Sequence, residues 1–217
     1  MAPSLSTTSY AVLGLLALRP LTPYELTQQM QRSLDYCWPT SERSLYDQPE
    51  RLVAAGLATP ITDENGGAPR RRYAITPAGR QALREWLATD SAMPRFQNEP
   101  LLRVLLADQA TVEDLHRVVG ALRAHVAQRR LLGLEQMAPY LQGEGLFQER
   151  AHIVTLAADL VSRLLDVLDD WATDVEAITR DWSTTERLGL TDDIREVLEQ
   201  MLTREQDRAT HQRRPQP

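Results

Sequence analysis

Several residue types that support chemistry or cross-linking are scarce in this chain. The single cysteine, Cys37, excludes an internal disulfide and a zinc site built on cysteines, and we expect it to be a small, partly buried hydrophobic residue. The apolar run at residues 10–18 is shorter than the roughly 20 residues that a membrane helix needs. No basic segment precedes this run as in a signal peptide. The sequence therefore predicts a cytoplasmic protein without a membrane partner.

Motifs of catalysis and cofactor binding are also missing: the chain has no HExxH, P-loop, GxSxG or glycine-rich dinucleotide turn. His116 and His125 are nine residues apart, so they would face opposite sides of one helix and could not share a metal. The adjacent acids at 169–170 and 192–193 would point apart on helices, as solvated surface groups do. These observations predict a protein that is not an enzyme and holds no cofactor or metal.

Lysine is absent, and the net charge of −6 is unevenly distributed. Residues 1–90 contain nine arginines and nine acidic residues, whereas residues 91–217 contain fifteen arginines and twenty-one acidic residues. The whole negative balance therefore belongs to the C-terminal half. An acidic chain argues against nucleic-acid binding, but the neutral N-terminal half can still present a local basic face.

The first two helices are predicted from their terminal signals. Residues 7–18 form an apolar pattern that Thr7 or Thr8 would begin and that a proline at position 20 would end. Thr22, followed by proline and then by Glu25 at the third helical position, is a capping box. It predicts a second helix that reaches residue 34.

A third helix is expected from Thr40 or Ser41, as the cap, to Gly56. Pro49 lies inside it, where it removes one backbone hydrogen bond and clashes with the carbonyl of Leu45, so we expect a kink or a short regular part. Leucines and a valine at positions 45, 52 and 53 would face inward. The residues expected to face outward are Glu42, Arg43, Tyr46, Asp47, Glu50 and Arg51.

A hairpin follows this helix, with strands at 57–62 and 71–75 and a turn at 63–67. Thr76 and Pro77 repeat the cap-plus-proline signal and predict a fourth helix to about residue 89. Helix, hairpin and helix in this order are the layout of a winged helix-turn-helix, in which the hairpin is the wing. Residues 91–100 contain two prolines and no periodicity, so they predict a linker between two domains.

The N-terminal domain offers candidate contacts to double-stranded DNA. Arginine suits phosphate because its planar guanidinium donates two parallel hydrogen bonds, and near the start of a recognition helix it can also pair with guanine. Strand alternation would send Arg70 and Arg72 to one face of the wing and Arg71 to the other. Carboxylates on the third helix oppose phosphate binding unless they are aimed at a cytosine amine or paired with Arg43 or Arg51. The candidate DNA-binding residues are Ser41, Arg43, Ser44, Tyr46, Arg51, Arg70, Arg71 and Arg72.

The C-terminal half is helical in pattern, with helices expected at 97–108, at 111–138 ending before Pro139, and at 146–182, the longest. Along the longest helix, apolar residues alternate steps of three and four from Val154 to Trp182, which is a heptad seam. Ile153, Leu160 and Val167 add a second stripe, so we expect one face to pack internally and the other to meet a second subunit. The candidate dimerisation residues are Val161, Leu164, Leu168, Trp171, Val175 and Ile178.

The stretches YAVLGLLALRPLTPYEL, SLYDQPERLVAAGL and PRRRYAITPAGR, within residues 8–85, resemble the PadR family of bacterial transcriptional regulators. The resemblance implies a winged-helix homodimer that binds a pseudo-palindromic operator, usually as a repressor, and releases it when an effector is sensed. It places Tyr46 at the family's recognition-helix tyrosine and Arg70 to Arg72 in its basic wing, whereas Pro49 departs from the common pattern. Family effectors range from phenolic acids to multidrug-like compounds.

The sequence thus predicts a mainly α protein: a winged-helix DNA-binding domain at 1–90, a linker at 91–100, a helical dimerisation and effector domain at 101–209, and a flexible tail at 210–217. A small aromatic or apolar effector could contact Trp171 and Trp182, although these side chains also suit an interface core. The alternative function is a helical protein–protein adaptor whose winged helix does not bind DNA. The acidic residues of the third helix favour that alternative.

Overall fold

The structure, a computed structural model, describes residues 5–63, 70–95 and 97–212, and it is mainly helical. The chain divides into two compact units, an N-terminal unit Met1–Pro94 and a C-terminal unit Arg95–Pro217. No helix in the described ranges combines the length and the apolar character that crossing a membrane requires.

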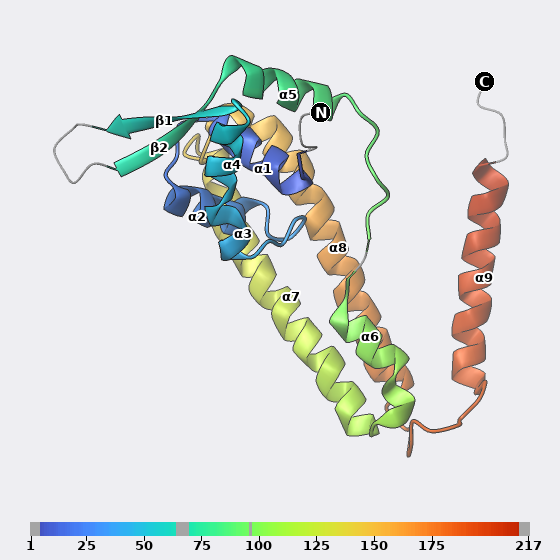
Figure 1. Cartoon of the computed structure of the whole chain (residues 1–217). Helices are drawn as coiled ribbons and strands as arrows, with labels where there is room; N and C mark the ends of the chain where they lie inside the picture. Colours follow the sequence, from blue (N-terminus) through green and yellow to red (C-terminus); the bar gives the residue numbers. More distant parts are fainter. Residues whose placement is uncertain (1–4, 64–69, 96, 213–217) are drawn as a thin grey trace. The chain divides into compact units, whose positions relative to one another are not determined.

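The N-terminal unit consists of five helices and one two-stranded sheet within its described residues (Figure 1). In chain order they are α1 (Thr7–Leu16), α2 (Pro23–Ser33), α3 (Glu42–Tyr46), α4 (Gln48–Ala54), β1 (Ala58–Asp63), β2 (Arg70–Ile75) and α5 (Pro77–Leu87). Apolar side chains from α1 to α4 and from both strands meet in one core. Its buried members are Val12, Leu13, Leu15, Leu16, Leu21, Leu26, Met30, Leu45, Leu52, Ala58 and Tyr73.

Side-chain caps begin α1, α2, α3 and α5 of this unit. The capping box of α2 is confirmed, because the Thr22 hydroxyl accepts the Glu25 N–H while the Glu25 carboxylate accepts the Thr22 N–H. Thr76 caps α5 through the Gly79 N–H. Helix α1 begins at Thr7, one of the two predicted starts, and Ser6 before it adopts the extended backbone conformation and accepts the N–H of Ser9.

The single third helix predicted from residue 41 to Gly56 is instead two helices, α3 and α4, that meet at Asp47. Pro49 occupies the first turn of α4, where its missing N–H leaves no hydrogen bond unmade. Leu45 of α3 and Leu52 of α4 both remain fully buried, so the break redirects the backbone without removing either helix from the core.

The hairpin is antiparallel, with a register that runs from Ala58 opposite Ile75 to Asp63 opposite Arg70. Residues 64–67 of the predicted turn lie outside the described residues. Leu21 adds a short bridge to β2, because its N–H and carbonyl both bond to the backbone of Tyr73, at 3.1 and 2.8 Å. The strand that carries the wing arginines is therefore attached to the segment just before α2.

The C-terminal unit contains α6 (Glu99–Leu105), α7 (Val112–Leu141), α8 (Ala151–Ile178) and α9 (Asp192–Gln212), with α7 and α8 side by side and antiparallel (Figure 1). Short 3-10 helices occupy Ala107–Gln109 and Gln148–Arg150. Buried side chains at the contact of α7 with α8 come from both helices. They are Val112, Leu115, Val119, Leu122, Val126, Leu165 and Ala172.

The predicted bounds of the two long helices are wrong in part. Helix α7 continues through Pro139 to Leu141, although Pro139 has no N–H to bond to the carbonyl of Glu135. Helix α8 has 28 residues against the 30 of α7, so α7 is the longer. Before α8, the Gln148 side chain bonds to the Gly145 N–H and the Tyr140 carbonyl and holds a turn where a helix was expected.

Trp182, predicted as the last seam residue, lies beyond the end of α8. Thr179 follows the helix, where its hydroxyl donates to the Val175 carbonyl at 2.7 Å and lies 2.8 Å from the His116 ring of α7.

The expectation that Cys37 is partly buried is also wrong: it is exposed, in the segment after α2, with its thiol 3.3 Å from the Leu34 carbonyl.

Candidate nucleic-acid interface

The outward face of α3 and α4 carries the side chains that the sequence assigned to it. Ser41, Arg43, Ser44, Tyr46 and Arg51 are all exposed. The Ser41 hydroxyl caps α3 by accepting the Ser44 N–H at 3.3 Å, and the two hydroxyls lie 3.0 Å apart. The Ser41 side chain is thus held in place by its bond to the first turn of α3.

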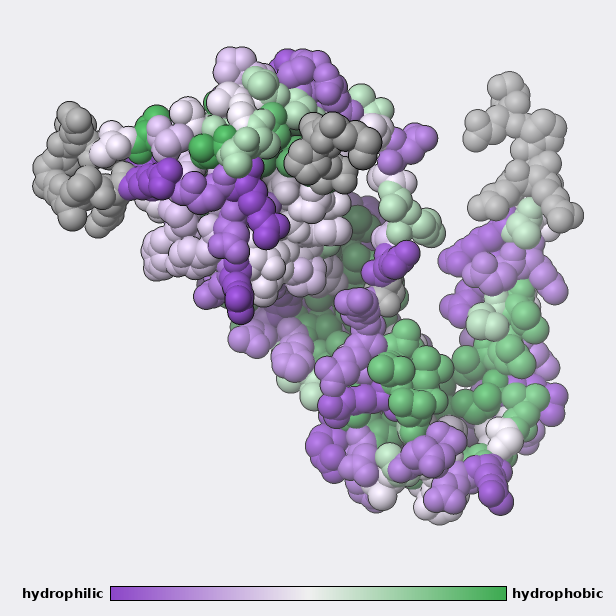
Figure 2. Space-filling view, in the orientation of Figure 1, coloured by the Kyte–Doolittle hydropathy of each residue, from purple (hydrophilic) through white to green (hydrophobic). Residues whose placement is uncertain are grey.

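Arg43 and Arg51 have no hydrogen bond or ion pair to another described side chain. Both guanidinium groups therefore keep their full set of donors for a ligand. Figure 2 shows that the surface is strongly hydrophilic from β2 across the face of α4 to α3. Of the predicted arginines with described side chains, these two are the ones ready to bind an anion without first losing a partner.

Arg71 is held by α4. Its Nη1 lies 2.9 Å from Oε1 of Glu50, and its guanidinium lies 5.4 Å from the centre of the Tyr73 ring. The Tyr73 hydroxyl donates to the same Glu50 oxygen at 2.5 Å. Burial raises the pKa of Tyr73, and the hydrogen bond to Glu50 and the charge of that carboxylate raise it further. The phenol therefore remains a donor at neutral pH.

Arg72 is held by α2, through an Nη2 that donates to Oε1 of Glu25 at 3.2 Å. The other oxygen of Glu25 completes the capping box with Thr22. Partial burial acts to raise the pKa of Glu25, but the hydrogen bonds from Thr22 and the positive charge of Arg72 outweigh it and lower the pKa. Glu25 is therefore an anion that joins the helix start to the wing.

The prediction that the wing arginines lie on two faces of the hairpin can be followed only for Arg71 and Arg72, because the Arg70 side chain lies outside the described part of the chain. Arg71 reaches α4 and Arg72 reaches α2. Neither projects free of the helices, which differs from the prediction that the wing would offer them directly to phosphate. The hairpin backbone carries both residues, but partners more than 20 positions away in the sequence set their side-chain positions.

Of the carboxylates on the α3–α4 face, only Glu50 is paired with an arginine among the described residues. Glu50 and Glu25 pair with the wing arginines, and Glu42 of α3 accepts a hydrogen bond from Gln31 of α2 at 2.9 Å. The sequence indicated that a carboxylate could be paired, but it named the arginines at 43 and 51 as partners. No local pattern marks the partners found, because each pair joins different secondary-structure elements.

The predicted dimerisation residues on α8 are half-buried rather than enclosed: Val161, Leu164, Leu168, Trp171, Val175 and Ile178 all keep part of their surface exposed. Helix α7 packs on one flank of this seam, where Leu165 and Ala172 are buried. On the other flank Ile153, Leu160 and Val167 are 49%, 60% and 64% exposed. The second stripe is thus uncovered in a single chain.

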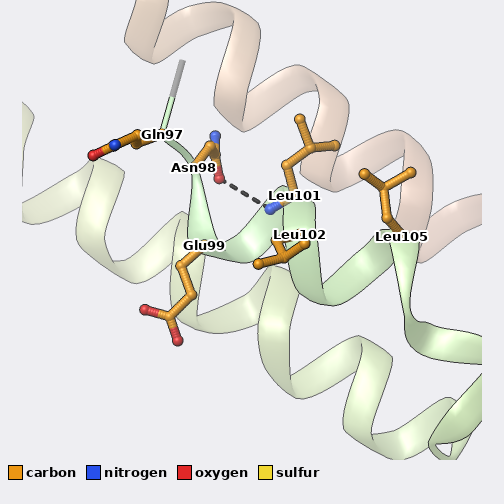
Figure 3. A pocket seen from close by; sticks show the side chains of 6 residues that line it. All are labelled: Gln97, Asn98, Glu99, Leu101, Leu102 and Leu105. Atoms are coloured by element: carbon orange, nitrogen blue, oxygen red, sulfur yellow. Dashed lines mark hydrogen bonds between the residues drawn. The ribbon is translucent and has the colours of Figure 1, made fainter. Parts of the chain in front are cut away.

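Helix α6 also has uncovered leucines. Leu101, Leu102 and Leu105 project into an open hollow of about 500 Å³ beside the helix, and Asn98 caps α6 through the Leu101 N–H at 2.9 Å (Figure 3). All three leucines are exposed, and Figure 2 shows apolar surface over α6 and over α9. The C-terminal unit therefore carries more apolar surface than a solvated helical unit needs.

The two tryptophans predicted to contact an effector lie on either side of the end of α8. Trp171 is half-buried on the helix, and Trp182 is half-buried beyond it. The described residues contain no cluster of three or more histidine, cysteine or acidic side chains that could hold a metal.

Comparison with known proteins finds sequence relatives of the N-terminal unit. The sequence profile of the transcriptional regulator PadR-like family matches residues 12–85. The negative transcriptional regulator PadR of Bacillus subtilis (strain 168) is 29% identical over 86 residues, which are 39% of this chain and 47% of that protein. The chain thus matches about half the length of this relative.

Solved structures extend the likeness in fold. Bacillus subtilis PadR in complex with operator DNA gives a TM-score of 0.68 at 17% identity, over 80% of this chain and 99% of that one. The Vibrio cholerae virulence activator AphA gives 0.63 at 21% identity, over 80% and 98%. Bacillus subtilis PadR in complex with p-coumaric acid gives 0.62 at 18% identity, over 81% and 100%.

These likenesses and the helix–hairpin–helix order confirm the predicted fold class, a mainly α protein with an N-terminal winged helix. The related proteins are transcriptional regulators, not enzymes. Residues 12–85 therefore form a PadR-like domain, homologous to part of Bacillus subtilis PadR.

Proposed function

We propose that this protein is a sequence-specific transcriptional regulator that binds a pseudo-palindromic duplex as a homodimer and acts as a repressor by occupying a promoter. The observation that carries the proposal is the pair of exposed, unpartnered guanidinium groups of Arg43 and Arg51 on the α3–α4 face of a PadR-like domain. A PadR relative of the same fold has been solved with operator DNA.

Within this proposal, Arg43 near the start of α3 pairs with a guanine edge, because the first residues of a recognition helix reach furthest into the major groove. Arg51 binds a phosphate, and Tyr46 and Ser44 add hydroxyl contacts. Helix α3 has only five residues, so few side chains read base edges from each unit. A dimer that places two such units on one duplex then supplies the missing specificity.

The test is selection of bound duplexes from a random library by the full-length protein, followed by titration of the selected duplex at two salt concentrations. We expect an enriched two-fold symmetric sequence and an affinity that falls steeply with salt. Arg51→Ala should flatten the salt slope by about 0.9 per bound arm, whereas Arg43→Ala should weaken binding by about 1–3 kcal/mol and relax the preference for guanine at its position. Arg117→Ala, which removes an exposed arginine of α7, is the matched control and should bind as wild type. Absence of enrichment and of salt-dependent binding would favour the adaptor function instead.

We assign dimerisation to the C-terminal unit, through the α8 seam and the uncovered stripe beside it. Replacing exposed Leu160 or Val167 by glutamate places a charge on the proposed interface without disturbing the contact of α8 with α7. Light scattering after size-exclusion chromatography should show a dimer for wild type and a monomer for either variant, with unchanged helical circular dichroism. Leu87→Glu alters an equally exposed leucine of α5 and should remain dimeric. A wild-type monomer at micromolar concentration contradicts the assignment.

A small aromatic or apolar effector would release the protein from DNA, with Trp171 and Trp182 as its contacts. PadR of Bacillus subtilis, of similar fold, has been solved with p-coumaric acid, which makes that compound the first probe. We expect quenching of tryptophan fluorescence that Trp171→Phe reduces, together with weaker DNA binding. Unchanged fluorescence and unchanged DNA affinity across a panel of aromatic acids and drug-like cations would exclude an effector of this class.

The proposed domain bounds place a linker at 91–100 between the DNA-binding domain at 1–90 and the helical domain at 101–209, with a flexible tail at 210–217. The boundary of the two compact units, after Pro94, falls in this linker. Limited proteolysis should cut first at 91–100 and in the tail. A first cut within α7 or α8 contradicts these bounds.

A further inference from the structure

We propose that Glu50 is a positioning residue that keeps Arg71 from binding DNA phosphates and so limits the affinity of this protein for duplexes of arbitrary sequence. The inference rests on the proposed DNA-binding function and concerns the same surface. It assigns the α4 carboxylate a part in specificity, although a carboxylate on that face otherwise only opposes binding.

The Glu50 carboxylate is fixed in place from the core side. Tyr73 is only 3% exposed, its backbone is bonded to Leu21 in both directions, and its hydroxyl donates to Oε1 of Glu50 at 2.5 Å. Because the pKa of Tyr73 is raised by burial and by Glu50, this donor persists at physiological pH. The carboxylate therefore meets Arg71 at a set position on α4.

The other partner of this pair, Arg71, lies at the surface. Its side chain is 56% exposed, and it contacts Glu50 at 2.9 Å and the Tyr73 ring at 5.4 Å. An exposed ion pair contributes little to stability, so a phosphate that approaches closely can displace the carboxylate. In the absence of DNA, the Arg71 guanidinium is nevertheless bound to Glu50.

When Arg71 exchanges Glu50 for a DNA phosphate, the net number of ions released on binding changes. A free arginine that binds phosphate releases a DNA counterion, which is the source of most non-specific affinity. When Arg71 leaves Glu50, the bared carboxylate gathers a cation of its own, and the net release is close to zero. Arg51, which binds a phosphate in the proposed complex, has no such partner among the described residues, so it contributes fully to salt dependence.

This difference separates specific from non-specific binding. On an arbitrary duplex, binding depends on ion release, and Arg71 adds almost nothing to it. On the selected duplex, base contacts hold the wing close enough for the exchange to occur. The ratio of specific to non-specific affinity is therefore larger with Glu50 than without it.

The experiment compares wild type, Glu50→Gln, Arg71→Ala and the double variant on a random-sequence duplex and on the selected duplex, over a range of salt concentrations. Glutamine keeps an acceptor for the Tyr73 hydroxyl but not the charge. We expect Glu50→Gln to steepen the slope on the random duplex by about 0.9 per bound arm and to bind it several-fold more tightly at 0.1 M salt. Arg71→Ala alone should leave that slope nearly unchanged, and the double variant should lose the steepening.

Glu42→Gln is the matched control, because it removes a charge from the same face where the partner is Gln31 rather than an arginine. Any effect of Glu42→Gln should persist in the Arg71→Ala background. Equal effects of the two glutamine substitutions, or steepening by Glu50→Gln that survives Arg71→Ala, overturns the inference. If wild type binds and Glu50→Gln matches it, the inference alone fails. If wild type binds neither duplex, the proposed function fails and the inference fails with it.

Discussion

Gly79→Ala is the substitution whose effect follows most directly from the packing of the N-terminal unit. Gly79 is the third residue of α5, where the helix starts against the end of α4 and the beginning of the hairpin. A Cβ at this position would lie 2.1 Å from the Leu57 carbonyl oxygen and 2.8 Å from Cγ1 of Ile75. The same carbonyl accepts the Thr76 N–H at 3.0 Å, so it cannot move without disturbing the start of α5.

The size of the effect can be worked from these distances. A carbon-to-oxygen contact settles near 3.3 Å, so the helix and the carbonyl must separate by about 1.2 Å. Over-packing of this kind typically costs about 1–3 kcal/mol, whereas alanine in place of glycine in a helix returns about 1 kcal/mol. Because the clash is with a backbone oxygen, its cost lies at the upper end of this range, and we expect a net loss of about 2 kcal/mol from the free energy of unfolding of the N-terminal unit.

Urea unfolding followed by hydrogen exchange in α1 and α5 measures this loss for the N-terminal unit itself. Gly14→Ala in α1 is the matched control, because nothing lies within 4 Å of its added Cβ, and it should stabilise the unit by about 0.5–1 kcal/mol. A Gly79→Ala protein as stable as wild type would refute the close approach of α5 to Leu57.

Two further predictions concern polar groups of the same unit. Ser9→Ala removes the donor of the buried 2.8 Å bond to Oε1 of Gln48 and should lower the free energy of unfolding by about 1–3 kcal/mol in urea titration; an unchanged midpoint would refute this. Glu25 has a lowered pKa, opposed by burial but produced by Thr22 and Arg72, so its contribution to stability is present above its ordinary pKa of 4.5 and is lost as the pH falls through the folded value. Melting temperatures of wild type should therefore fall more steeply below pH 4.5 than those of Glu25→Gln, and parallel curves would contradict this.

The features that the sequence predicted well are those with local causes. The capping box at Thr22 involves groups three residues apart, and so does the cap that begins α7 at Thr111. The hairpin strands were predicted to within about one residue because alternation and turn residues lie in the same short stretch. Such signals need no knowledge of the rest of the fold.

The features that it missed depend on contacts between distant segments. Nothing near Arg71 in the chain announces that Glu50 lies beside it, because the tertiary fold brings β2 onto α4. The start of α8 is likewise set by Gln148, whose side chain bonds back to the end of α7. Pro49 was recognised as disruptive, but only packing shows that it begins a second helix rather than bending one.

The central claim is that a dimer presents two N-terminal units to one duplex. Hydroxyl-radical footprinting of the selected duplex with the full-length protein tests it most directly. We expect two protected segments with centres about one helical turn, roughly 10 base pairs, apart, and weaker protection of both with Arg43→Ala. A single protected segment, or none at protein concentrations where the duplex is saturated, would contradict it.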